Sequence, residues 1–254
     1  MNIVACVKHV ALLGEDIEFL DDGRVDPDFV EFDVNEWDAC AVEEALQIRD
    51  TIPGSQVTVV TVGGEPATDA LIRCLAMGAD AAIRVAVDDD WSCMDPITTA
   101  RLLALAIAPL QPHLVLTGLQ SSDSAQGSTG TALSELLQLA CVVGVTEIDR
   151  TGFPASSIVT RELAGGFHDV LEVSLPALFA VQTGINQPRY VTMRALRDVQ
   201  QFPIDIIDAT LPAAPGFQLV TTTIPAQAEG VQLIEGSAHE IALAIATIVK
   251  ERSA

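Results

Sequence analysis

The sequence predicts an α/β fold in which a parallel sheet is flanked by helices, with added antiparallel strands and a C-terminal linker and helix. Through residue 137, short runs rich in Val and Ile alternate with segments of helical spacing. Past residue 142, apolar runs follow one another without helices between them, which indicates antiparallel strands. Residues 203–228 are rich in Pro, Ala and Thr, as expected for an extended linker before a last helix.

The first elements are a strand, a hairpin and a helix. Residues 2–9 are rich in Val and Ile, which predicts a central buried strand. Residues 17–20 and 29–32 flank a Gly-containing turn and predict a hairpin. Asn35 is a good N-cap for a helix that reaches about residue 49.

The next elements repeat the strand–helix alternation. Gly78 is placed as the C′ residue of a helix, and Asp95 with Pro96 forms an N-cap followed by proline at N1. The predicted strands are 56–62, 81–87 and 113–117, and the predicted helices are 69–77, 96–108 and 131–137.

The later elements are short. Predicted strands at 158–162, 170–173 and 177–181 extend the sheet in antiparallel fashion, with a hairpin turn at 164–166, and a short helix follows at 193–197. The last helix covers 238–251, where apolar residues follow helical spacing. It can pack on another chain or on its own domain. We therefore divide the chain into an α/β domain, residues 1–202, and an extended linker with the C-terminal helix, residues 203–254.

Composition excludes several classes of function. The formal charge of −22, from 35 acids and 13 bases, repels nucleic acid and anionic membranes. It favours partners with basic patches or simply gives solubility. No apolar run reaches the length of a membrane span, and the N-terminus has no export signal. Five scattered cysteines without a Cys-x-x-Cys pair indicate a reducing cytoplasm and no disulfide framework or zinc site.

Catalytic and metal-binding patterns are also missing from the sequence. The four histidines are dispersed and give no metal site. We find no nucleophile–base–acid set and no paired carboxylates in a recognisable motif, so the chain is not expected to be an enzyme by itself.

One loop carries a chemical signal. Residues 118–130 are rich in Gly, Ser and Thr and lie between a predicted strand and a predicted helix. Small residues let backbone N–H groups approach an anion, and the helix N-terminus adds partial positive charge. The loop has no Lys and lacks the Gly-x-Gly-x-x-Gly spacing, so it is neither a Walker loop nor a dinucleotide fingerprint. A solvated strand-to-helix turn is the alternative to a phosphate site.

Several motifs in a fixed order carry a family resemblance. They are Val7-Lys8, residues 33–38, 41–45, 75–80 and 120–130, Arg161-Glu162 with Gly165-Gly166, and Asn186-x-Pro188-Arg189-Tyr190. Through them the chain resembles the β subunit of electron transfer flavoproteins along nearly all its length. Residues 35–38, 120–123 and 234–236 look most like the branch of methylotrophic bacteria that serves trimethylamine dehydrogenase and similar amine dehydrogenases.

The resemblance implies a subunit of a heterodimeric electron carrier. A homologous α subunit would hold most contacts to one FAD, which carries electrons singly. The β subunit would bury a structural AMP in its parallel-sheet nucleotide-binding domain and dock a flavin-containing dehydrogenase through a recognition loop. The C-terminal helix would pack on the α subunit.

The resemblance also implies site residues. The motif positions that match the AMP pocket are Cys6, Asn35, Val62, Gly118, Gln120, Asp123, Gly127, Ser128, Thr129 and Gly130. Trp37 matches an aromatic position at the flavin edge, although it can instead staple the start of its helix. Leu13 lies in a segment that reaches the flavin in relatives.

The same resemblance implies residues that contact partner proteins. The recognition loop maps to Tyr190 through Arg197, and Met193 stands at the position of the family's anchoring Leu; an ordinary core residue is the alternative. Arg194 and Arg197, with Arg189, form a basic cluster that steers docking or neutralises nearby carboxylates. Glu162 matches an acid that contacts the mobile flavin domain, or is a plain surface residue.

Two departures and two alternatives remain. Ala164 replaces the acid that usually precedes the Gly-Gly pair, and the nearest acid after it is Asp169. Bifurcating relatives place a second FAD where AMP sits; they usually carry an apolar residue at the position of Thr129 and an acid at that of Ala125, so both residues favour AMP. A nucleotide-sensing regulatory module fits the α/β pattern but leaves residues 186–190 and the C-terminal helix unexplained.

Overall fold

The computed structural model describes residues 1–12, 18, 20, 26, 30–87, 94–210 and 233–252. Its contacts divide the chain into two compact units, residues 1–221 and 222–254. The first unit holds the sheets, and the second holds the C-terminal helix.

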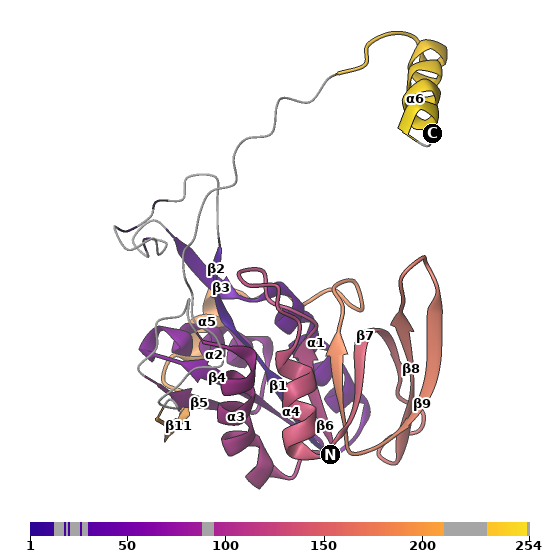
Figure 1. Cartoon of the computed structure of the whole chain (residues 1–254). Helices are drawn as coiled ribbons and strands as arrows, with labels where there is room; N and C mark the ends of the chain where they lie inside the picture. The colour runs from indigo at the N-terminus through magenta and orange to yellow at the C-terminus, as the bar shows by residue number, and fades with distance from the viewer. Residues whose placement is uncertain are drawn as a thin grey trace. The chain divides into compact units, whose positions relative to one another are not determined.

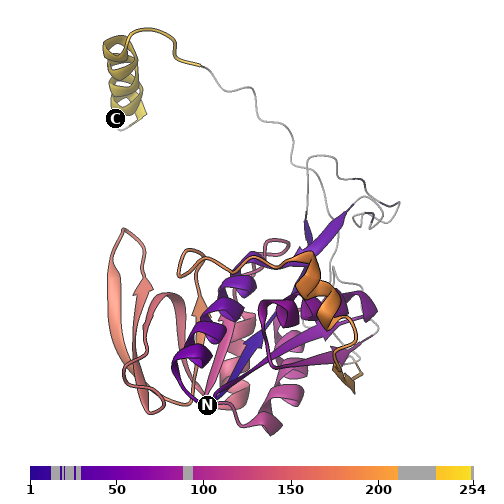
Figure 2. The same ribbon diagram turned by 180° about the vertical axis from the view of Figure 1, so that it is seen from behind.

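The first unit is built on a mostly parallel nine-stranded sheet in the order β11-β5-β4-β1-β6-β10-β7-β8-β9, and β2 and β3 form a separate two-stranded sheet (Figures 1 and 2). The strands are β1 Asn2–Cys6, β2 His9–Leu12, β3 Glu31–Val34, β4 Gln56–Gly63, β5 Ala81–Ala86, β6 Leu114–Gly118, β7 Ala140–Asp149, β8 Ser156–Glu162, β9 His168–Ser174, β10 Ala177–Val181 and β11 Asp205–Asp208. The α/β class predicted from the sequence is therefore confirmed.

Helices connect the parallel strands and cover the sheet. They are α1 Glu36–Thr51, η2 Glu65–Ala67, α2 Thr68–Met77, α3 Pro96–Ile107, η3 Ala108–Leu110, α4 Thr129–Leu137 and α5 Met193–Val199, with α6 Ala238–Arg252 in the second unit. Asp95 caps α3 by accepting from the N–H groups of Ile97 and Thr98, and Gly78 ends α2 with φ 117°, both as predicted. Ser237 and Glu240 form a capping box at the start of α6.

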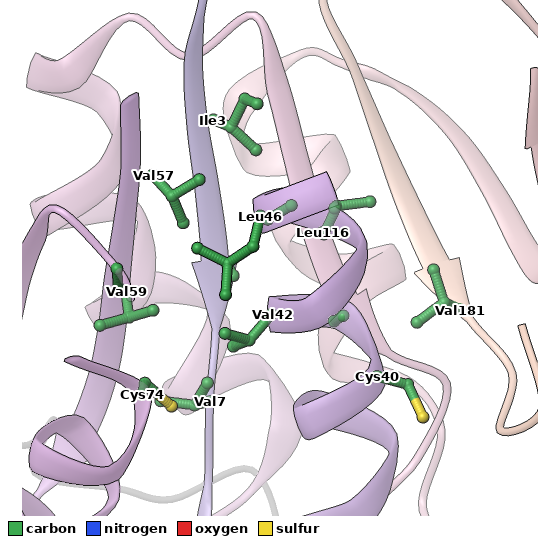
Figure 3. Packing of buried hydrophobic residues seen from close by; sticks show 14 of the residues in the cluster. Ile3, Val7, Cys40, Val42, Leu46, Val57, Val59, Cys74, Leu116 and Val181 are labelled. Atoms are coloured by element: carbon green, nitrogen blue, oxygen red, sulfur yellow. The ribbon is translucent and has the colours of Figure 1, made fainter. Parts of the chain in front are cut away.

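Two apolar layers hold the helices on the sheet. Figure 3 shows Val42 and Leu46 of α1 packed over Ile3, Val57 and Leu116 of the central strands, all fully buried. The layer on the other face is formed by α3 and α4. Because helices follow parallel strands, the N-termini of α1, α3 and α4 come to the edge of the sheet where the strands end.

The strand pairing differs from the prediction at β10. This strand pairs in parallel with β6 and with β7, not antiparallel. All five of its residues are buried, so its sequence has no alternation that would reveal its direction. The antiparallel extension of the sheet consists of β7, β8 and β9, of which β7 was not among the predicted strands. Strands β8 and β9 meet at a turn with Gly165 and Gly166 in the left-handed region.

The N-terminal strand is also shorter than predicted. It ends at Cys6, and residues 9–12 form β2, which pairs antiparallel with β3 in the register His9↔Val34. The hairpin predicted between 17–20 and 29–32 lies largely outside the described residues. Its second arm overlaps β3, which pairs with β2, a strand that the sequence pattern did not separate from the first strand.

The predicted linker contains an edge strand. Residues 205–208 form β11, which pairs in parallel with β5, so the chain stays with the sheet past the predicted boundary at 202. Residues 211–232 of the linker lie outside the described residues. The last helix, Ala238–Arg252, matches the prediction within one residue.

Candidate functional site

One cavity of the described structure lies at the carboxyl edge of the sheet. It has a volume of about 350 Å³ and is bounded by the ends of β1, β4 and β6 and by the first turns of α1, α3 and α4. The chain passes from β1 to β4 on one side, and β6 lies on the other side of β1. Such a reversal of strand order is where open α/β sheets bind ligands.

Most of the residues that the sequence matches to an AMP pocket line this cavity. Nine of them come from β1, β4, β6, the loop after β6 and the starts of α1 and α4: Cys6, Asn35, Val62, Gly118, Gln120, Gly127, Ser128, Thr129 and Gly130. Asp123 is not among the lining residues. Leu13 lies outside the described residues.

The loop before α4 has the geometry of an anion site. Gly127 has φ 59° and Ala125 has φ 48°, so the backbone turns through the left-handed region twice before the helix begins. Ser128, at the N-cap position, makes no side-chain bond to the helix. The N–H groups of Thr129 and Gly130 lie in the first turn, where helix geometry provides no acceptor. These donors and the helix dipole fit a phosphate.

Gly118 is required by a close approach of α1. A Cβ atom there would clash with Asp38 Oδ1 and would lie 2.6 Å from Trp37 Cβ. The end of β6 therefore packs directly on the first turn of α1, and only glycine permits this contact.

Asp38 ties two strand ends together. Its carboxylate accepts the N–H of Lys8, after β1, at 2.8 Å and the N–H of Gly118, at the end of β6, at 2.9 Å. The residue is 8% exposed, and this burial raises the pKa of its carboxyl to about 7, although both hydrogen bonds favour the charged form. Asp38 lines the cavity but is already engaged by protein donors.

Asn35 acts on the loop and not on its helix. Its amide Nδ2 donates to Gln120 O at 2.8 Å, and its Oδ1 accepts the N–H of Ser122 at 3.2 Å. Asn35 occupies the N-cap position of α1, as predicted, but its side chain makes no cap bond to the helix. Both polar groups of the Asn35 side chain bond to the loop, so neither is left for the N–H groups of the helix.

A lysine does reach the loop, from outside it. Lys8 Nζ contacts Asp123 Oδ2 at 2.7 Å and Ser121 Oγ at 3.3 Å. The Asp123 side chain is 7% exposed. Burial alone would raise the pKa of Asp123, but Lys8 holds it below its usual range. This pair fixes the loop at the rim of the cavity.

The sequence motifs did not indicate Lys8 or Asp38 as site residues. Lys8 follows the first buried strand, and Asp38 lies in the first turn of the next helix; both positions come to the carboxyl edge in a parallel sheet. That placement was the available signal. Their partners are distant in sequence, so composition and spacing could not reveal them.

Trp37 lies beside the loop but does not line the cavity. It is half-buried, and its indole Nε1 donates to Gln182 Oε1 at 2.9 Å, just after β10. The ring joins the start of α1 to the end of a central strand and keeps some surface free for a contact with another group.

The segment matched to the recognition loop is exposed. Tyr190 is 88% exposed and Met193 is 65% exposed, so Met193 is not a core residue. Arg194 and Arg197 on α5 are exposed, whereas Arg189 pairs with Glu43 on α1 at 2.7 Å. The predicted basic cluster is thus divided between two outward-facing arginines, of which Arg194 lies 3.8 Å from the exposed Asp198, and Arg189, which pairs with a buried carboxylate.

Glu162 stands at the end of β8, exposed and opposite His168 of β9. Its neighbour Arg161 pairs with Asp169 at 2.8 Å. The acid that follows the Gly-Gly pair is thus used within the hairpin, which leaves Glu162 facing outward.

The described residues include neither a candidate metal site nor a helix that could span a membrane. In the described parts of the chain, no three His, Cys, Asp or Glu side chains come together in a way that would hold a metal ion. None of the described helices has the length and apolar character that crossing a bilayer requires.

Comparison with known protein families decides between the functional classes that an α/β nucleotide-binding fold permits. A family model for the electron transfer flavoprotein domain matches residues 25–211. The chain belongs to the electron transfer flavoprotein family. It is 34% identical to electron transfer flavoprotein subunit beta of Methylophilus methylotrophus, over 99% of this chain and 98% of that protein. It is 27% identical to the subunit of the same name in Bacillus subtilis, over 100% and 99%.

A relative with another name has similar coverage. The chain is 30% identical to the caffeyl-CoA reductase–Etf complex subunit CarD of Acetobacterium woodii, over 99% of both proteins. Together these similarities identify an electron transfer flavoprotein β subunit. The chain therefore has a role in electron transfer, and its family implies an α partner and association with a flavin.

Proposed function

We propose that this β subunit holds a structural AMP in the cavity at the carboxyl edge of the sheet. It also supports the FAD domain of the α subunit and docks a primary dehydrogenase, from which the flavin accepts electrons one at a time. The observation that carries the proposal is the cavity of about 350 Å³ closed by the uncapped N-terminus of α4.

A phosphate group fits the α4 end of the cavity. The N–H groups of Thr129 and Gly130 and the hydroxyls of Ser128 and Thr129 supply donors there. The one carboxylate among the lining residues, Asp38, is occupied by two backbone N–H groups. A monophosphate can therefore be held without a loop lysine.

A purine base fits the remaining walls. This side has an apolar lining from β4, η2, α3 and the segment just before α3: Val62, Pro66, Ala67, Met94 and Leu103. An apolar slot with a few polar groups at one end is the usual form of a small-molecule site. AMP offers the matching pair of a flat base and one anionic group.

Residues outside the cavity support the other parts of the proposal. The flavin supplies the redox chemistry when bound; in this chain Trp37 offers an aromatic edge to it and Glu162 an outward acid to the flavin domain. The exposed Met193, beside Arg194 and Arg197, offers a flexible apolar anchor to the dehydrogenase. An amine dehydrogenase is proposed as the donor from the methylotroph-like motifs at 35–38, 120–123 and 234–236.

A charge placed in the loop tests the phosphate site. Gly127→Asp puts a carboxylate beside the α4 N-terminus, and Gly127→Asn is its uncharged match. A Cβ at this position meets only Leu119 O, at 3.5 Å, and both substituted residues tolerate the left-handed region. We expect the Gly127→Asp heterodimer to purify without AMP and the Gly127→Asn heterodimer to retain it. Equal nucleotide content in the two variants would contradict the site assignment.

A further inference from the structure

Two adjacent carboxylates are buried on α1, away from the cavity. Glu43 is 5% exposed and Glu44 is 2% exposed. Each has an arginine partner: Arg189 for Glu43 and Arg150 for Glu44, both at 2.7 Å. Burying charge is costly unless it is paired and hydrogen-bonded, so each pair fixes the segment that brings the arginine.

The Glu43–Arg189 contact is multiple. Glu43 Oε2 accepts Arg189 Nε at 2.7 Å and the Arg189 backbone N–H at 3.1 Å, and Oε1 accepts Nη2 at 3.1 Å. Burial would raise the pKa of Glu43, but the bonds from Arg189 and Gln47 hold it below the usual range. Bidentate contact together with a backbone bond sets the path of the chain as well as the place of the side chain.

A second contact holds the same stretch slightly earlier in the chain. Asn186 Nδ2 donates to Cys40 O at 3.0 Å and to Glu44 Oε2 at 3.1 Å. Residues 186–189 are therefore bound to Cys40, Glu43 and Glu44, which lie within about one turn of α1.

The residues that follow have much weaker attachment of their own. Tyr190 projects outward, and α5 has no buried residue. Met193, Leu196 and Arg197 border a hollow of about 410 Å³ between α5, α2 and the β2–β3 hairpin. Among the neighbouring apolar residues, Val191 and Val199 only border the core. The polar contacts to α1 must therefore contribute much of the order in this segment.

We propose that Glu43, acting through Arg189, is the positioning residue that fixes residues 190–199 in the orientation needed for docking. The proposal rests on the proposed docking role of Met193. Arg189 is then an anchor on the inner side of the segment, while Arg194 and Arg197 face the partner. Glu43 itself touches neither the dehydrogenase nor the flavin.

The test uses the Glu43→Gln variant in the assembled heterodimer with an amine dehydrogenase as donor. The substituted amide turns a donor toward the donors of Arg189 and loses the charge. We expect the KM for the dehydrogenase to rise by about tenfold, the scale of one lost charge-assisted contact. The kcat at saturating donor and the flavin content should stay at the parent level, and amide hydrogen exchange in residues 190–199 should accelerate.

Glu44→Gln is the matched control, since it removes an equally buried charge from the same helix and keeps an oxygen for Asn186. We expect it to lower stability without raising the KM. Equal KM increases in both variants, or an unchanged KM and unchanged exchange in Glu43→Gln, would overturn the proposal.

Met193→Ala separates this proposal from the docking assignment. In the parent it should raise the KM, and in the Glu43→Gln background it should add little, because the anchor is already misplaced. If Met193→Ala has no effect in the parent, the docking role of Met193 fails. Exchange in residues 190–199 still decides whether Glu43 positions the segment.

Discussion

Asp38 shows how one buried carboxylate can organise a candidate site through backbone hydrogen bonds. It joins the N–H group of Lys8, which follows β1, to that of Gly118, which ends the neighbouring parallel strand β6. The residue just before the same helix, Asn35, holds both the carbonyl of Gln120 and the N–H of Ser122. Asn35, which the family motifs suggest as a ligand contact, thus shapes the loop that is proposed to hold the phosphate.

The raised pKa of Asp38 makes a pH-dependent prediction. Folding raises this pKa from 3.8 to about 7, so the folded state binds the proton more tightly. The resulting stabilisation is fully present below pH 4 and is lost as the pH rises through 7, at ~1.4 kcal/mol per pKa unit. We expect the free energy of unfolding of the parent to fall relative to that of Asp38→Asn across this window. Parallel profiles from denaturant titration would refute the assignment.

Gly118 makes a steric prediction. Gly118→Ala places a methyl group against Asp38 Oδ1 and Trp37 Cβ, and such overpacking costs ~1–3 kcal/mol. We expect lower stability and reduced nucleotide content, measured by thermal unfolding and by analysis of the released nucleotide. Gly54→Asn, in open space at φ 77°, is the control and should retain both properties.

At the scale of elements, α1 is the part that connects the two proposed functions. Its start holds the loop at the cavity, and its next turns hold residues 186–189 before the exposed Tyr190. Its apolar face meanwhile packs on the central strands (Figure 3). One helix therefore sets the position of the proposed nucleotide loop relative to the proposed docking segment.

Helices whose ends are marked by local cap residues could be predicted from the sequence. Strands that are defined by their pairing partners could not. Asp95-Pro96 and Gly78 marked helix ends correctly because capping is local. The direction of β10 and the existence of β7 and β11 depend on partners distant in sequence. The same holds for the site: the loop at 118–130 was evident, whereas Lys8 and Asp38 meet it only through the fold.

The last helix makes a prediction about assembly. Ile241, Ala244, Ile245 and Ile248 form an apolar stripe along α6. Ile245 is 51% exposed, and Ala246 lies off this stripe. If the stripe packs on the α subunit, Ile245→Asp buries an unpaired charge there and Ala246→Asp does not. We expect size-exclusion chromatography to show separated subunits for Ile245→Asp and a heterodimer for Ala246→Asp. Intact heterodimer from both variants would exclude this packing.

At the scale of the whole molecule, charge distribution predicts how docking responds to salt. The chain carries a net charge of −22, and the exposed Arg194 and Arg197 lie beside the proposed anchor. Replacing both with Gln should lower kcat/KM for the dehydrogenase about tenfold at low salt and flatten its dependence on ionic strength. Arg101→Gln, at an exposed position of α3, is the control. An unchanged salt dependence in the double variant would show that Arg194 and Arg197 do not steer docking electrostatically.

The most direct test of the whole account is the identity of the nucleotides in the purified heterodimer. The complex is denatured, and the released molecules are identified and counted by chromatography and mass spectrometry. One AMP and one FAD per heterodimer is the predicted result, with AMP in the cavity at the α4 N-terminus. Two FAD and no AMP would contradict the assignment of this cavity, and a nucleotide without any flavin would contradict the proposed support of the FAD domain.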